Sequence, residues 1–302
     1  MARFGSVVTA MVTPFHSDGA LDLDGAVVLA DHLVNAGSDG LVLAGTTGEG
    51  PVLTDGEALE LFRAVAGAVN VPIIASTGSN DTAHSVAFTR SVADIGVDGV
   101  LVVTPYYNRP SVAGLSAHFR TVAASTDLPV VLYDIPHRTG RRIGSELLIE
   151  LAHQVPNIVG VKDSTGDVAA AARVVADTPE SFEVYSGDDA LLLPLLSVGG
   201  VGIVSVAGHW AAATLAELVA SFQAGDLDGA RSANHRLAES YDFESSELYP
   251  NPLPAKAACR AQGLPAGQCR LPNAVTPESL EDEARGVIER LRQHSSNRQS
   301  VG

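Results

Sequence analysis

Lysine is nearly absent from this chain: of its 19 lysine and arginine residues, only Lys162 and Lys256 are lysines. A reaction that needs a primary amine side chain therefore has two candidates. Positive charge is scarce as well, because 35 acidic residues leave a formal net charge of −16. Non-specific binding to nucleic acid or to an anionic membrane needs a basic surface, so we expect neither partner.

Other absences narrow the class of protein further. No apolar run reaches the roughly 18 residues of a membrane-spanning helix, and the first residues lack the apolar core of a signal peptide. We therefore expect a cytoplasmic protein. Cys259 and Cys269 are too few for a disulfide scaffold and lack zinc-site spacing, so free thiols are expected. The histidines are scattered, which predicts no metal site.

Glycine-rich nucleotide loops are missing too, since the chain has neither a P-loop nor a Gly-x-Gly-x-x-Gly motif after its first expected strand. What recurs instead, about every 30 residues, is a short β-branched run bounded by Gly, Pro, Asp or Asn. Runs that are apolar throughout suit parallel strands buried on both faces. The eight expected strands are Val7–Val12, Gly40–Ala44, Pro72–Ser76, Gly99–Thr104, Pro129–Asp134, Ile158–Lys162, Phe182–Ser186 and Gly202–Val206.

Segments of helical spacing lie between these strands. The clearest are Leu23–Ala36, Asp55–Val69, Thr82–Ile95, Leu115–Ser125 and Ser145–Val155. Eight β/α units favour a closed (β/α)8 TIM barrel over an open doubly wound sheet. Strand patterns then stop, and helical spacing continues over 211–240 and 275–293. We expect a barrel over residues 1–225 and a C-terminal helical appendage over 226–302, with a frayed end over 294–302.

Polar residues collect at the carboxyl ends of the expected strands, where barrels of this kind carry their catalytic groups. Lys162 closes a buried strand there. An amine removed from water favours its neutral form, which attacks a ketone to give an imine that serves as an electron sink. The alternative is an ion pair with Asp163, but four other polar strand ends favour the Schiff base. Lys256, on an expected helix, should be solvated.

Neighbouring strand ends supply candidate partners for this lysine. Tyr133 lies on the preceding strand at matching height and suits an acid/base role, the alternative being a packed aromatic plug. Thr46 and Thr47 offer hydroxyl and backbone N–H groups to a small carboxylate, the alternative being a capped turn. Asp188 and Asp189 are expected at a helix N-terminus rather than on a metal.

Taken in order and spacing, four motifs resemble those of the N-acetylneuraminate lyase superfamily, and within it the dihydrodipicolinate synthase family, over about residues 5–292. The motifs are Gly45–Glu49, Pro105–Pro110, Tyr133–Gly140 and Val161–Asp163. The resemblance implies a lyase of lysine and diaminopimelate biosynthesis that needs no cofactor. It would condense pyruvate, bound as a Schiff base, with L-aspartate 4-semialdehyde, and it would be a homotetramer built from two dimers.

The resemblance also implies roles for single residues. Lys162 matches the Schiff-base lysine, and Tyr133, Thr46 and Tyr107 match a proton relay in which Tyr107 reaches into the neighbouring subunit's site. This chain departs from the family pattern at Asp134, where Asn is common.

Four further positions match the substrate contacts. Thr47 matches the contact to the pyruvate carboxylate, and Arg138 the residue that binds the carboxylate of the semialdehyde. Gly187 and Val204 match backbone positions that line the pocket.

Two other functions remain open. A sister aldolase or lyase of 2-keto-3-deoxy sugar acids or sialic acid would keep Lys162 and Tyr133 but generally has a smaller residue at Arg138. A non-catalytic barrel that binds a keto acid would tolerate the loss of Lys162 or Tyr133. A last implication concerns feedback: lysine-inhibited members carry Ser, His and Glu at positions that here hold Gly50, Ala58 and His84, so little inhibition by L-lysine is expected.

Overall fold

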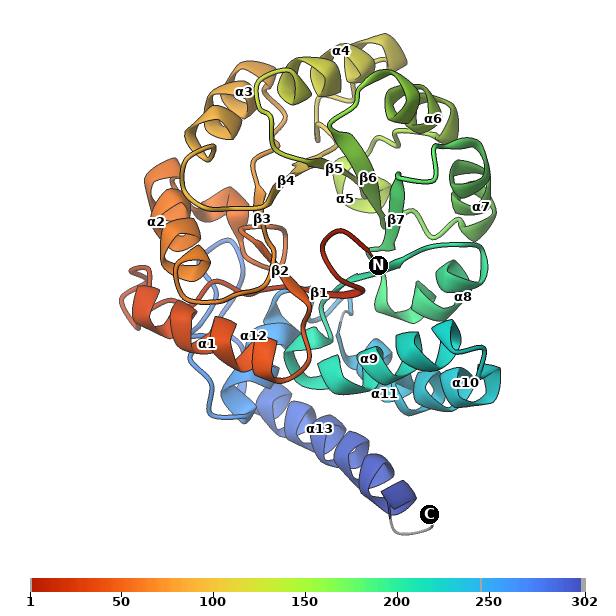
Figure 1. The fold of residues 1–302 in the computed structure, drawn as a ribbon. Helices are drawn as coiled ribbons and strands as arrows, with labels where there is room; N and C mark the ends of the chain where they lie inside the picture. The colour runs from red at the N-terminus through yellow and green to blue at the C-terminus, as the bar shows by residue number, and fades with distance from the viewer. Residues whose placement is uncertain (1, 245, 300–302) are drawn as a thin grey trace.

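Eight parallel strands close into one barrel in chain order, with β8 pairing back onto β1 (Figure 1). The computed structural model describes residues 2–244 and 246–299. The strands are β1 Val7–Ala10, β2 Gly40–Leu43, β3 Ile73–Ser76, β4 Gly99–Val103, β5 Val130–Asp134, β6 Ile158–Asp163, β7 Glu183–Ser186 and β8 Gly202–Ser205. Every strand end lies within two residues of the expected run, so the predicted (β/α)8 barrel is confirmed.

Helices surround the barrel as an outer ring, except the short helix Pro136–Thr139, which lies inside that ring (Figure 1). They are α1 Leu23–Asn35, α2 Asp55–Ala66, α3 Thr82–Ser91, α4 Val112–Ala123, α5 Pro136–Thr139, α6 Ser145–Gln154, α7 Val168–Asp177, α8 Leu192–Ser197 and α9 Gly208–Gln223, with 3-10 turns η1 Gly50–Val52 and η2 Asp189–Leu191. The apolar face of each long helix packs against the strands. The strands are therefore buried on both faces, and their sequences are apolar throughout. No helix in the described part of the chain has the length and apolar composition needed to cross a membrane.

The inside of the barrel is filled with side chains at its amino end and open at its carboxyl end. Phe4 is buried against the strand bottoms in the same cluster as Val8 and Val42. A Cβ on Gly99 would lie 2.8 Å from the Phe4 ring, so this position has room only for glycine. Because the amino end is plugged, any cavity along the barrel axis lies at the carboxyl ends of the strands.

Four helices follow the eighth β/α unit: α10 Leu227–Arg236, α11 Ala238–Phe243, α12 Leu253–Ala261 and α13 Glu278–Gln299. Helix α10 packs on α9, and α12 packs on both α9 and α13. The proposed boundary at residues 225 and 226 falls in the turn between α9 and α10 and stays a prediction. Helix α13 continues to Gln299, and the expectation that 294–302 form a frayed end stays a prediction. Residues 300–302 lie outside the described chain.

Candidate active site

A cavity of about 150 Å³ opens at the carboxyl ends of the strands. Its lining comes from the ends of β5 and β6, from the loops after β2, β5, β6, β7 and β8, and from two residues of the C-terminal segment. The lining residues are Thr46, Thr47, Tyr133, Ile135, His137, Arg138, Lys162, Ser164, Gly187, Asp188, Val206, Glu244 and Asn251. Strand-end residues that are far apart in sequence thus meet at one point, as expected for this fold.

Lys162 projects from β6 into this cavity and is 5% exposed. Its Nζ lies 4.3 Å from the centre of the Tyr133 ring. Within the described chain Nζ has no ion pair, and Asp163, the alternative partner, instead accepts a hydrogen bond from the Thr165 N–H at 2.7 Å. A Cβ on Gly187 would lie 2.9 Å from Lys162 Cε. Glycine at position 187 therefore gives the lysine its room.

Tyr133 stands at the height that the sequence predicts, because β5 and β6 pair with Tyr133 opposite Lys162. The ring is buried, and the Tyr133 carbonyl accepts hydrogen bonds from the N–H and hydroxyl of Thr104, both at 2.9 Å. The next residue, Asp134, is buried, and burial raises the pKa of its carboxyl to about 7. Its carboxyl accepts a hydrogen bond from the Ile143 N–H at 3.1 Å.

The loop after β2 presents Thr46 and Thr47 to the cavity. Glu49 has a φ of 55°, a left-handed conformation that side chains rarely adopt. Its N–H donates to the Thr46 carbonyl at 3.1 Å, and the Thr13 hydroxyl donates to the Gly48 carbonyl at 2.6 Å. These bonds hold the loop in a tight turn, which fixes the two threonine hydroxyls relative to Lys162.

Asn251, from the segment before α12, joins two of the expected substrate contacts. Its Nδ2 donates to Thr47 Oγ1 at 2.9 Å, and its carbonyl accepts from Arg138 Nη2 at 3.3 Å. Arg138 lies on α5 and lines the mouth of the cavity, as its position past Pro136 predicts. It is tied to this backbone carbonyl rather than to an acidic neighbour. Nothing in the strand pattern pointed to Asn251, since its partners are more than 100 residues away.

Two of the expected site residues lie outside the lining. Tyr107 has a φ of 72° and is 91% exposed, so its ring does not enter its own chain's cavity. That placement is compatible with a role in a neighbouring subunit, which stays a prediction. Val204 is buried in the barrel interior, and on this side the cavity is lined by Val206.

The prediction that Lys256 is solvated is wrong, because its side chain is completely buried. Its Nζ lies 2.7 Å from Glu49 Oε1, donates to the Gln268 carbonyl at 2.9 Å and stands 4.2 Å from the centre of the Phe15 ring. Helix α12 turns this residue toward the barrel, and the carboxylate that pairs with it comes from the β2 loop. The apolar residues around Lys256 could have indicated that it is buried. The ion pair itself could not be predicted, because Glu49 is 207 residues away in the sequence.

A pair of buried carboxyl groups, Asp189 and Glu244, also escaped the sequence analysis. Asp188 caps η2 by accepting from the Ala190 N–H at 3.1 Å, which confirms its helix N-terminal role. Asp189 instead accepts from the Ser205 hydroxyl and, at 2.9 Å, from the Val206 N–H. Glu244 hydrogen-bonds to Asp189 and lines the cavity. Burial raises the pKa of both carboxyl groups.

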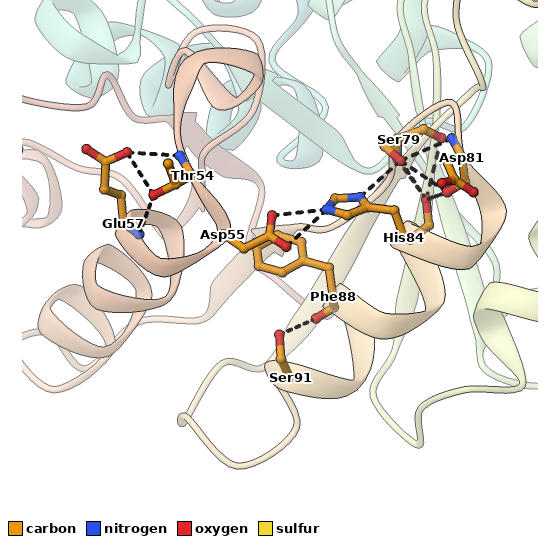
Figure 2. Close-up of polar contacts among 9 residues, drawn as sticks. Thr54, Asp55, Glu57, Ser79, Asp81, His84, Phe88 and Ser91 are labelled. Atoms are coloured by element: carbon orange, nitrogen blue, oxygen red, sulfur yellow. Dashed lines mark hydrogen bonds and ion pairs between the residues drawn. The ribbon is translucent and has the colours of Figure 1, made fainter.

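A second cavity, of about 250 Å³, lies outside the barrel and is lined by residues of α2, α3 and the loops after β2 and β3. Gly50, Ala58 and His84, the positions compared with lysine-inhibited relatives, all line it. The sequence comparison missed Asp55, whose carboxylate also lines it and contacts His84 Nε2 at 3.0 Å (Figure 2). A Cβ on Gly50 would lie 2.1 Å from the Ala44 carbonyl oxygen, so only glycine fits this turn.

The two cysteines are free thiols, and burial raises the pKa of each to about 12. Neither is a thiolate at neutral pH, which excludes both as nucleophiles there. Among the side chains that the structure describes, those of residues 2–244 and 246–293, no three His, Cys, Asp or Glu are grouped as metal ligands. The described cavity therefore has one strong nucleophile candidate, the Lys162 amine.

Comparison with known proteins assigns this arrangement to a family. The model of the Dihydrodipicolinate synthetase family matches residues 3–291. The chain belongs to the dihydrodipicolinate synthetase family. It is 48% identical to the 4-hydroxy-tetrahydrodipicolinate synthase of Moorella thermoacetica over 272 residues, 89% of this chain and 92% of that protein. For the enzyme of the same name from Bacillus subtilis, identity is 45% over 89% of this chain and 93% of the relative.

Solved structures of family members have the same fold throughout. The dihydrodipicolinate synthase of Cyanidioschyzon merolae, solved with lysine bound, superposes with a TM-score of 0.93 at 42% identity, covering 97% of this chain and 99% of that one. The Bacillus anthracis enzyme DapA-2 gives a TM-score of 0.91 at 40% identity, covering 96% and 99%. The family likeness thus includes the C-terminal segment, in which Asn251 precedes α12 and lines the cavity.

Proposed function

We propose that this chain is a lyase that condenses pyruvate with L-aspartate 4-semialdehyde to 4-hydroxy-tetrahydrodipicolinate, in lysine and diaminopimelate biosynthesis. The observation that carries the proposal is the unpaired Lys162 amine in a cavity that also presents Tyr133, Thr46, Thr47 and Arg138. Family membership supports the substrates, because relatives 43–48% identical bear this enzyme's name.

In the proposed reaction, the Lys162 amine attacks the pyruvate ketone and water leaves, giving an imine. The imine draws electrons from the adjacent methyl group, so that loss of one proton gives an enamine. The enamine carbon then bonds to the aldehyde carbon of the semialdehyde, the aldehyde oxygen takes up a proton, and the imine to Lys162 forms again. The α-amine of the semialdehyde attacks the imine carbon and displaces the Lys162 amine, which closes the ring and releases the product. In this proposal Tyr133, whose ring lies beside Nζ, moves these protons, and Thr46 and a neighbour's Tyr107 complete the relay.

The two substrate carboxylates are assigned to different parts of the cavity. Thr47, whose hydroxyl is oriented by Asn251, takes the pyruvate carboxylate. Arg138 at the mouth takes the semialdehyde carboxylate, for which a guanidinium fork is well shaped. Gly187 and Val204 complete the walls through their backbone. We further propose a cytoplasmic homotetramer, a dimer of dimers, on the family likeness and on the exposed ring of Tyr107.

A panel of aldehydes assayed with pyruvate tests this proposal. L-aspartate 4-semialdehyde should give the highest kcat/KM, and a sugar aldehyde a far lower one. Arg138→Ala should lower kcat/KM for the semialdehyde by about 10–10²-fold, the value of a hydrogen bond between charged groups, while the pyruvate adduct on Lys162 still forms. Preference for a sugar aldehyde would instead favour the sister aldolases of 2-keto-3-deoxy sugar acids or sialic acid.

A further inference from the structure

Two hydrogen-bond acceptors in the active-site cavity have no donor. Glu244 Oε2 and Asn251 Oδ1 are both buried, and neither has a hydrogen-bond partner in the described chain. Both residues line the cavity that holds Lys162. A buried acceptor without a partner costs free energy, about 1–3 kcal/mol for a polar group. Acceptors left open at a substrate cavity are therefore suited to a ligand group that donates hydrogen bonds.

The charge behind these acceptors is negative. Asp189 accepts hydrogen bonds on both oxygens, from the Ser205 hydroxyl and the Val206 N–H, which favours its ionised form. Glu244 hydrogen-bonds to Asp189, and a hydrogen bond between two carboxyl groups needs a proton on one of them, so the pair carries one negative charge when Asp189 is ionised. Since that charge is enclosed, it favours a cation in the adjoining cavity more strongly than a solvated carboxylate would.

A positive group stands next to the same acceptors. Arg138 Nη2 donates to the main-chain carbonyl of Asn251, whose side chain carries one of the two open acceptors. At the cavity mouth, the Arg138 cation thus lies next to Asn251, whose side chain is one of the two open acceptors. The other open acceptor, on Glu244, adjoins the negative charge of Asp189. An ammonium group and a carboxylate on the same carbon, the α-amino acid group, complement this arrangement.

We infer that Glu244 and Asn251 form a subsite for the α-ammonium group of the second substrate. The inference rests on the proposed function, in which Arg138 takes the carboxylate on the same carbon. In this arrangement Glu244 is a specificity residue: it selects an amino aldehyde over an aldehyde of the same length that lacks the amine. Lys162 and its pyruvate imine lie outside this subsite.

The test compares two aldehydes, L-aspartate 4-semialdehyde and succinate semialdehyde, which differ only in the α-amine. Wild-type enzyme should favour the amino aldehyde in kcat/KM by about tenfold or more, because the subsite binds the amine and because the amine also displaces Lys162 to release the product. The subsite is therefore read from the change in this ratio between variants. Glu244→Met should lower that ratio by about tenfold, mainly through the amino aldehyde. Glu244→Gln is the matched control, because its amide still donates to Asp189 and still presents a carbonyl oxygen; its ratio should stay near wild type.

Borohydride trapping of pyruvate on Lys162 in each variant reports whether the barrel and its first step are intact. A wild-type ratio near one would overturn the inference without any variant. So would a Glu244→Met enzyme that forms the adduct normally and loses both aldehydes equally. Adduct formation in wild-type enzyme without turnover of either semialdehyde would instead refute the proposed function, and the subsite with it.

Discussion

Lys162 and Lys256 are both buried, but their surroundings differ in every respect that matters for chemistry. Lys162 lies beside the Tyr133 ring, faces a cavity and has no ion pair in the described chain. Lys256 is enclosed by Glu49, the Gln268 carbonyl and the Phe15 ring. Burial lowers the pKa of Lys256, but Glu49 opposes that effect and no space admits a ketone. Burial alone therefore does not make a lysine a nucleophile; an open cavity and the absence of a carboxylate partner do.

The Lys256 pair has a structural consequence of its own. Glu49 lies on the loop that carries Thr46 and Thr47, and its second carboxylate oxygen accepts from the Arg270 N–H at 2.9 Å. The pair thus fastens the C-terminal segment to the loop on which the proposed carboxylate contact depends. A buried ion pair adds little net stability, but breaking one leaves an uncompensated buried charge.

The largest expected effect is a difference in the free energy of unfolding between variants of the two lysines. Lys256→Met leaves the Glu49 carboxylate buried without its cation and should lower the free energy of unfolding by about 3–5 kcal/mol. Lys162→Met, the matched control, breaks no ion pair and should cost much less while abolishing the pyruvate adduct. Urea unfolding of both variants measures the difference. Equal destabilisation by the two substitutions would remove the distinction drawn here.

Tyr107→Phe tests whether the Lys162 site is complete within one chain. Because the ring lies outside its own cavity, loss of the hydroxyl should lower kcat by about 10²-fold or more only if it serves a neighbour's relay. Substitutions that separate the dimer should lower activity equally while the barrel stays folded. Sedimentation with activity assays would check both, and a fully active monomer would refute the shared site.

Sequence reasoning succeeded where the signal is local and periodic. The short apolar runs predict the strands, and the strand order of a barrel places Tyr133 opposite Lys162. The same order brings the strand-end residues Thr46, Thr47 and Arg138 to one cavity. The same reasoning gave no sign of contacts made by the C-terminal segment, because pairing across some 200 residues leaves no periodic pattern.

Lys256 shows that limit most clearly. Its helix was expected, but which face of that helix is buried depends on Glu49, a residue of another element. Asn251 and Glu244 were missed for the same reason. Each reaches the cavity from segments whose sequence indicates only a joint or a helix end.

Asp134→Asn tests a buried carboxyl that, unlike Glu49, forms no ion pair in the described chain, although Arg142 lowers its pKa from a distance. Its pKa is raised from 3.8 to about 7 by burial, so folding takes up a proton between these values and stability falls as pH rises through them. The asparagine carries no charge, so the variant should gain about 1–3 kcal/mol over wild type at pH 8, since one pKa unit is worth about 1.4 kcal/mol. Near pH 4 the gain should vanish. Urea unfolding at both pH values checks this, and a pH-independent difference would contradict it.

The smallest expected effect concerns a free lysine molecule rather than a lysine residue. L-lysine should inhibit little, because Gly50 and Ala58 offer the second cavity no polar side chain and Asp55 is engaged by His84. Steady-state rates with added L-lysine measure this. His84→Ala, which releases Asp55, should increase whatever inhibition is present. Strong inhibition of the wild-type enzyme at sub-millimolar L-lysine would show that the comparison with lysine-inhibited relatives is wrong.

The most direct measurement is reduction of the protein with borohydride in the presence of pyruvate, followed by peptide mass spectrometry. A single reduced pyruvate adduct should appear on the peptide that contains Lys162, and none on the peptide that contains Lys256, which lies in the same sample as an internal control. Lys162→Met should remove the adduct entirely. An adduct on Lys256, or none at all, would contradict the assignment of Lys162 as the Schiff-base lysine and leave a keto-acid-binding barrel as the better account.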